Sequence, residues 1–281
     1  PFIDRIAPQL IDIYTAIGDL VTAQDLQAKY IPSSPIDPAV WPTLHLLAGT
    51  EDSKRLLLYQ ILSDYRQAHR SRHPSLFLAP LHIALTIART LYDLTTVALI
   101  LNNIGLVHSE LGDQQQALHY YEQALPLTRQ VEDRSGEAYT LNNIGLVHSE
   151  LGDQQQALHY YEQALPLRRQ VGDRSGEAIT LTSIGSVYSD LGDQQQALHY
   201  FEHALPLTRQ VGDRWGEAAT RYHLAMALAD LGDLARAEEE LQTVVAIDEA
   251  TNHPNLAGDR AALERMRARR EQCADVADAA G

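Results

Sequence analysis

The sequence predicts an all-α fold in which antiparallel helix pairs stack on one another as a solenoid. Near-identical copies of a 40-residue unit begin at Leu101, Leu141 and Leu181. Within each copy, apolar residues recur with the period of an α-helix, and Gly-Asp pairs interrupt that pattern at fixed positions. Because every copy repeats the same pattern, we expect an array built by addition of units and not a domain around a single core.

The first helix of each unit is indicated by its apolar face. In the second copy, residues at i, i+3, i+4 and i+7 share one side of a helix: Leu141, Ile144, Gly145 and His148. This helix should end near Gly152, because glycine readily takes the left-handed conformation that follows a helix C-terminus.

The second helix should begin at Asp153, whose side chain can accept hydrogen bonds from the first free N–H groups of the helix. Its apolar stripe consists of Ala157, Tyr161, Ala164 and Leu165. We expect it to end near Gln170, with Asp173 capping the next helix. Two helices joined by so short a turn should lie antiparallel.

The sequence on either side of the three close copies continues the pattern in weaker form. The predicted segments are 1–50, a helical segment with a Pro-rich irregular stretch; 51–97, a degenerate helix pair; 98–137, 138–177 and 178–217, the close copies; 218–251, a diverged fourth copy; and 252–281, a capping helix and tail. A capping helix is expected because the last unit of a solenoid needs a polar outer face.

Seven positions of each copy match the pattern of the tetratricopeptide repeat (TPR), which runs large, large, Gly or Ala, aromatic, Ala, aromatic, Ala. They are Leu101, Ile104, Gly105, His108, Ala117, Tyr121 and Ala124; Leu141, Ile144, Gly145, His148, Ala157, Tyr161 and Ala164; and Leu181, Ile184, Gly185, Tyr188, Ala197, Phe201 and Ala204. The chain therefore resembles this family, although Arg129, Arg169 and Arg209 replace the proline expected late in the second helix. A 40-residue unit with a GDRSGE-like linker is similar to kinesin light chain and the adaptor Pins. The resemblance implies a right-handed α–α superhelix that binds peptides along its concave face.

Composition argues against nucleic acid and membranes as partners. The net charge is −15, and Lys29 and Lys54 are the only lysines, whereas phosphate binding depends on clustered basic residues. No apolar run approaches the roughly 20 residues of a membrane-spanning helix. The single cysteine, Cys273, cannot form an internal disulfide. We therefore predict a cytoplasmic protein that binds neither nucleic acid nor membrane.

The sequence predicts no catalysis, metal site or cofactor. His119, His159 and His199 form a column, but equivalent residues of stacked helix pairs lie roughly 8–10 Å apart, whereas zinc ligands lie about 2 Å from one ion. No GxxxxGK[ST] phosphate-binding loop occurs. Cys273 has no histidine partner placed by any motif.

The predicted binding face lies opposite the core on the first helix of each unit, where helical geometry aligns equivalent residues in columns. Its residues are Leu99, Asn103, Leu106 and Glu110; Tyr139, Asn143, Leu146 and Glu150; Ile179, Ser183, Ser186 and Asp190; and Ala219, His223, Met226 and Asp230, with Asn102 and Asn142 flanking them. An asparagine amide can both donate to and accept from the backbone of an extended peptide. The acidic column favours a basic partner, although it can equally serve solubility.

Three functional hypotheses follow. The first is a non-enzymatic scaffold that binds a protein or peptide segment in its groove. The second is the sensor or regulatory region of a larger bacterial effector, either a nucleotide-dependent switch protein or a caspase-like protease, since the sequence starts at Pro1 without methionine and its tail resembles such proteins. The third is self-association, because like repeats offer like surfaces.

Overall fold

The computed structural model describes residues 51–68 and 77–280, so the segment predicted over residues 1–50 lies outside the described residues. The described residues form α-helices joined by short turns, with no strand among them. The predicted all-α repeat class is thus confirmed. The chain divides into two compact units, Pro1–Asp133 and Arg134–Gly281.

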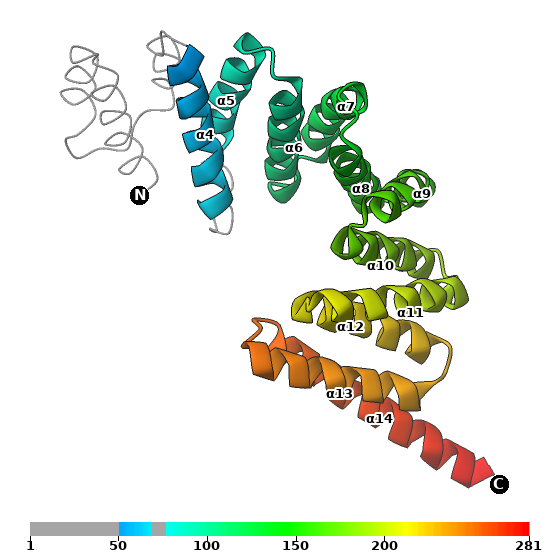
Figure 1. Ribbon diagram of the computed structural model, residues 1–281. Coiled ribbons are helices and arrows are strands. Elements are labelled where there is room, and N and C mark those ends of the chain that lie inside the picture. The colour runs from blue at the N-terminus through cyan, green and yellow to red at the C-terminus, as the bar shows by residue number, and fades with distance from the viewer. Residues whose placement is uncertain (1–50, 69–76, 281) are drawn as a thin grey trace. The chain divides into compact units, whose positions relative to one another are not determined.

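The described part of the first unit contains four helices (Figure 1). They are α4 (Glu51–Ala68), α5 (Leu78–Thr90), α6 (Leu94–Glu110) and α7 (Gln114–Gln130). Each helix packs against the next along the chain. Their shared core includes Leu57, Leu81, Ile87 and Ile104, all of them buried.

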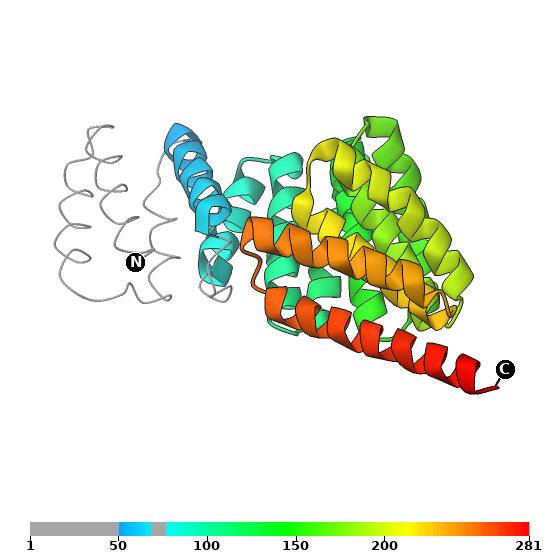
Figure 2. The same cartoon turned by 90° about the horizontal axis from the view of Figure 1, so that it is seen from below.

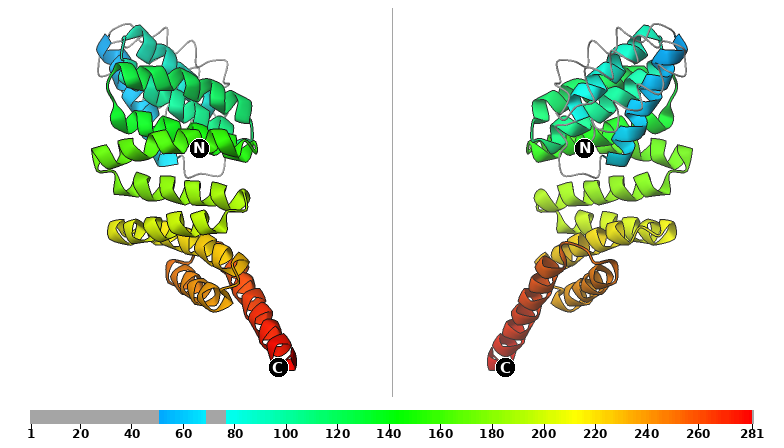
Figure 3. Two further views of the ribbon diagram at one scale, coloured as in Figure 1. Left: turned by 90° about the vertical axis from the view of Figure 1, so that its right-hand side faces the viewer. Right: turned by 90° about the vertical axis from the view of Figure 1, so that its left-hand side faces the viewer.

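The second unit contains the successive helix pairs α8/α9, α10/α11 and α12/α13, followed by α14. Their bounds are α8 (Arg134–Glu150), α9 (Gln154–Val171), α10 (Arg174–Asp190), α11 (Gln194–Val211), α12 (Arg214–Asp230), α13 (Leu234–Thr251) and α14 (Leu256–Ala280). The first helices of neighbouring pairs also meet, α8 with α10 and α10 with α12. Figure 3 shows the helices of this unit lying in successive rows.

The helices begin and end at the residues that the sequence indicated. The Asp153 side chain accepts a hydrogen bond from the Gln156 N–H, and Asp173 does the same for the N–H of Gly176. Gly152 follows the end of α8 with φ +81°, in the left-handed region where a glycine has no steric penalty. The boundaries therefore follow from local capping chemistry.

A close approach within each pair explains the glycine of the repeat pattern. A Cβ placed on Gly145 would lie 2.7 Å from Cε1 of Tyr161, and one on Gly185 would lie 2.6 Å from Cε1 of Phe201. Both rings are buried in the core. The absence of a side chain at these glycines lets α8 meet α9, and α10 meet α11, with an aromatic ring between them.

Ion pairs connect α9 to α10 and α11 to α12. The Glu177 carboxylate is buried and accepts hydrogen bonds from Arg169 at 2.7 Å and Arg174 at 2.8 Å. Burial alone would raise the pKa of Glu177, but hydrogen bonds and charge from the two arginines outweigh it and hold the pKa below its usual value. Arg169, at the position where the tetratricopeptide pattern has proline, thus joins α9 to α10 through its ion pair with Glu177.

The helix α14 packs over the last helix pair of the second unit. Figure 2 shows it running beside α13, with which it packs. Its residues Ala262, Leu263 and Met266 are buried against the core of α12 and α13. Along the same side, its arginines Arg267 and Arg270 bond the buried Glu238 of α13 at 3.1 and 2.7 Å.

Candidate functional site

The predicted binding face of the second unit runs over α8, α10 and α12. Apolar side chains on this face are accessible, with Leu146 40% exposed and Ile179 51% exposed. The acidic column is accessible as well, since Glu150, Asp190 and Asp230 are all exposed. This face therefore offers both apolar surface and negative charge to a partner.

The two asparagines of α8 differ in their environments. Asn142 is buried, and its amide oxygen accepts a 3.0 Å hydrogen bond from the Thr180 hydroxyl of α10. Asn143 is also buried, 7% exposed, but its amide nitrogen has no hydrogen-bond partner among the described residues. Asn142 thus joins neighbouring repeats, while Asn143 retains an unused donor at the predicted face.

The remaining predicted residues of this unit lie on α8, α10 and α12 as follows. Tyr139, Ser183, Ser186 and Met226 are half-buried, and Ala219 is exposed. His223 stacks on the ring of Phe201 with centroids 5.7 Å apart, and desolvation lowers its pKa despite the opposing charge of Asp190. A neutral imidazole at this position can donate one hydrogen bond and accept another.

The predicted residues of the first unit all lie on α6. Leu99 and Glu110 are exposed, Asn103 and Leu106 are half-buried, and Asn102 is buried. The same order of apolar, amide, apolar and acidic side chains is therefore present on this helix.

A cavity of about 660 Å³ lies among α12, α13, α14 and the turn between the last two helices. Trp215, Tyr222 and His223 of α12 form part of its lining. Asp248 and Asp259 also line it. His223, a predicted binding residue, thus connects this cavity to the face of α12.

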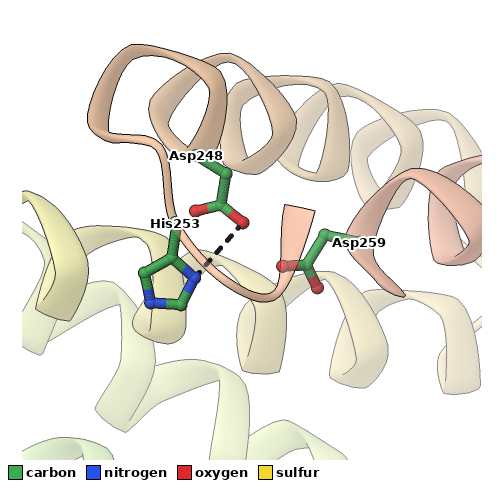
Figure 4. A group of neighbouring side chains, drawn as sticks. All are labelled: Asp248, His253 and Asp259. Carbon is green, nitrogen blue, oxygen red and sulfur yellow. Dashed lines mark ion pairs between the residues drawn. The ribbon is translucent and has the colours of Figure 1, made fainter. Parts of the chain in front are cut away.

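Three side chains converge beside the cavity: Asp248 from the last turn of α13, His253 from the turn, and Asp259 from the first turn of α14 (Figure 4). One ligand atom from each lies within 4.8 Å of the other two. Nδ1 of His253 lies 3.7 Å from Oδ2 of Asp248. Burial, together with the adjacent Asp248 carboxylate, raises the pKa of Asp259 to about 6.

Sequence reasoning missed this cluster, because it predicts residues 252–281 only as a capping helix and tail. The signal that could have found it is an aspartate in the last turn of one helix, a histidine in the turn, and an aspartate in the first turn of the next. A tight reversal brings such positions together. The repeats gave no hint of it, since this arrangement occurs at the diverged end of the array.

Stacked helical hairpins with an accessible face on their first helices define the class of helical-repeat binding proteins. Models of the tetratricopeptide repeat match residues 96–170, 136–210 and 218–251, together more than half of the chain. The chain belongs to the tetratricopeptide repeat family. Among curated protein sequences, none matches it significantly.

Solved structures share the fold at low sequence identity. BtubC (BKLC) from P. vanneervenii is 19% identical with a TM-score of 0.64, over 76% of this chain and 88% of that one. A putative kinesin light chain with nearly identical TPR-like repeats from Podosopora anserina is 16% identical with a TM-score of 0.56, over 72% and 97%. The signal transduction ATPase PH0952 from Pyrococcus horikoshii, which has a tetratricopeptide repeat sensor, is 14% identical with a TM-score of 0.59, over 87% and 36%.

Within the described residues, no helix combines the length and apolar character needed to cross a bilayer.

Proposed function

We propose that the chain is a non-catalytic scaffold that binds a protein or peptide segment along the faces of α8, α10 and α12. The observation that carries this proposal is the unused amide donor of Asn143, which is more than nine-tenths buried on that face. A buried donor without a partner costs about 1–3 kcal/mol. Because the Asn143 amide nitrogen lies just beneath the surface, a ligand carbonyl would remove that cost once neighbouring side chains shift to admit it.

The surroundings of Asn143 indicate the chemistry of the segment. The exposed side chains of Leu146 and Ile179 would pack against apolar residues of the ligand. The exposed carboxylates of Glu150 and Asp190 would attract lysine or arginine. A partly apolar, basic segment is therefore the partner that this face fits.

The test is selection of binders from a random peptide library displayed on phage, followed by affinity measurement with the selected peptides. We expect enrichment of basic peptides, and we expect Asn143→Ala to weaken their binding roughly 10-fold, since a buried hydrogen bond contributes about 1–3 kcal/mol. Asp190→Asn should reduce the salt dependence of binding, because it removes an exposed charge.

The matched control is Glu162→Gln, which removes an exposed carboxylate from α9 and not from the proposed face. It should leave affinity unchanged. Selected peptides that bind equally well to wild type, Asn143→Ala and Asp190→Asn would rule out this face as the binding site.

A second candidate function is the sensor region of a larger switch protein. It is favoured by the likeness to PH0952, of which this chain covers 36% of the length. The test is the gene sequence on either side of the encoded segment. An adjacent phosphate-binding loop would support the sensor role, and an open reading frame that codes for repeats alone would exclude it.

A further inference from the structure

The carboxylate of Asp248 is the least compensated charge in the second unit's cap. Its side chain is 1% exposed, and neither oxygen accepts a hydrogen bond from the described residues. It also lies in the last turn of α13, where the partial negative charge of the helix C-terminus opposes a carboxylate. A buried ionised group of this kind is stable only when a cation or a proton neutralises it.

The side chains next to Asp248, those of His253 and Asp259, carry electron pairs and no permanent positive charge. Nδ1 of His253 accepts a 3.3 Å hydrogen bond from the N–H of Asn255, so this nitrogen carries its lone pair and no proton, and a bound ion would take that lone pair over from the N–H group. It faces Oδ2 of Asp248 at 3.7 Å. One oxygen of Asp259 points into the same space (Figure 4).

The guanidinium of Arg265 does not neutralise Asp248. Arg265 lines the same cavity, but no ion pair joins it to either aspartate within the part of the chain that the structure describes. Three donor atoms therefore converge from α13, the turn and α14, with mutual separations of at most 4.8 Å.

We propose that Asp248, His253 and Asp259 form a binding site for a divalent transition-metal ion, Zn²⁺ or Mn²⁺. One imidazole and two carboxylates suit such ions better than Ca²⁺ or Mg²⁺, which prefer oxygen ligands throughout. The cavity leaves room for water or a ligand group at the remaining coordination positions. The ion would join the end of α13 to the start of α14 and so fix the cap of the array.

The test uses the full chain after treatment with a chelator. Isothermal titration with ZnCl₂, MnCl₂ and CaCl₂ at neutral pH measures affinity, and thermal melts measure stabilisation. We expect saturable Zn²⁺ or Mn²⁺ binding at one site and a raised Tm, with much weaker Ca²⁺ binding. Asp248→Asn and His253→Gln should each weaken binding by about 100-fold or more, since even loss of an outer-sphere partner costs 10–100-fold.

Fluorescence of Trp215 can show whether the ion binds at this site. The rings of Trp215 and His253 lie 4.9 Å apart. In a Trp41→Phe variant, Trp215 is the one tryptophan that remains. Co²⁺ bound at the proposed site should quench its fluorescence and show visible d–d absorption, and Asp248→Asn should abolish both signals.

Two controls separate this site from other metal binding. His199 and His203 on α11 are exposed, one helical turn apart, with ring centroids 4.2 Å apart, so they form a competing chelating pair. His203→Gln should leave the Trp215 signal intact. Glu239→Gln removes an exposed carboxylate from α13 that lies outside the cavity lining and should have no effect.

The folded state of the key variant is checked by circular dichroism. Without metal, Asp248→Asn should melt at the wild-type temperature or above it, because it removes an uncompensated buried charge. Three outcomes would overturn the proposal: no Zn²⁺ or Mn²⁺ binding by the wild-type chain, equal binding by Asp248→Asn, or loss of all binding in His203→Gln.

Discussion

The substitution Gly185→Ala tests the packing that holds α10 against α11. The added Cβ would lie 2.6 and 2.8 Å from Cε1 and Cδ1 of Phe201, below the distance that real side chains tolerate. The ring is completely buried, so it cannot swing into solvent. Overpacking of this severity costs about 2–3 kcal/mol, and the better helix propensity of alanine returns about 1 kcal/mol. We expect a net loss of about 1–2 kcal/mol.

The assay is urea unfolding followed by circular dichroism, with the midpoint and slope compared between variants. The matched control is Gly258→Ala in α14, where no atom lies within 4 Å of the added Cβ. That variant should gain up to about 1 kcal/mol from helix propensity alone. Combining Gly185→Ala with Phe201→Leu should recover stability relative to the sum of the single changes. If Gly185→Ala were as stable as Gly258→Ala, the close-approach argument would be wrong.

Three further predictions concern contacts between repeats. Glu177→Gln should destabilise the chain by about 1–2 kcal/mol at neutral pH. Because the folded pKa of Glu177 is lowered, the stability that its carboxylate contributes is fully present above the ordinary pKa of 4.5 and is lost as pH falls through the lowered value. Thermal melts across acid pH should therefore show a smaller fall in Tm for the variant than for wild type. Thr180→Val should cost about 1–3 kcal/mol in urea unfolding, since it leaves the buried Asn142 oxygen without its donor. Removal of α14 should uncover Leu228 and Leu241 and cause association, which light scattering would detect.

Each of these predictions has an outcome that would contradict it. A parallel pH dependence of stability in Glu177→Gln and wild type would show that the arginine pairs do not shift the carboxyl. A Thr180→Val variant as stable as wild type would mean that the bond between α8 and α10 is replaced by solvent. A monodisperse protein without α14 would show that the last repeat needs no cap.

The helices and their core could be predicted because the signals for them are local. Asp153 caps its own helix through the N–H of Gln156, and Gly152 ends the preceding one, all within a few residues of sequence. The apolar period likewise places Tyr161 on the buried side of its helix, opposite Gly145. These features depend on backbone geometry that the nearest residues decide.

For the binding face, the sequence could predict only which side of each helix its residues occupy, and not how far each residue is buried. Helical geometry assigns Asn142 and Asn143 to neighbouring positions, but it does not show how far the next repeat covers each of them. The structure buries both and gives Asn142 a partner 38 residues away, on α10. Whether an amide is used within the fold or left for a ligand therefore depends on how adjacent helices pack.

By itself, the sequence determined the family, the helical hairpins and the residues that begin and end them, because helix period and capping act over a few neighbouring residues. Tertiary structure decided which polar groups meet: Glu177 pairs with Arg169 across a repeat junction, and Asp248 lies beside His253 and Asp259 across a helix reversal. The physical reason is that these groups meet through space, at distances set by how helices pack and not by their positions along the chain.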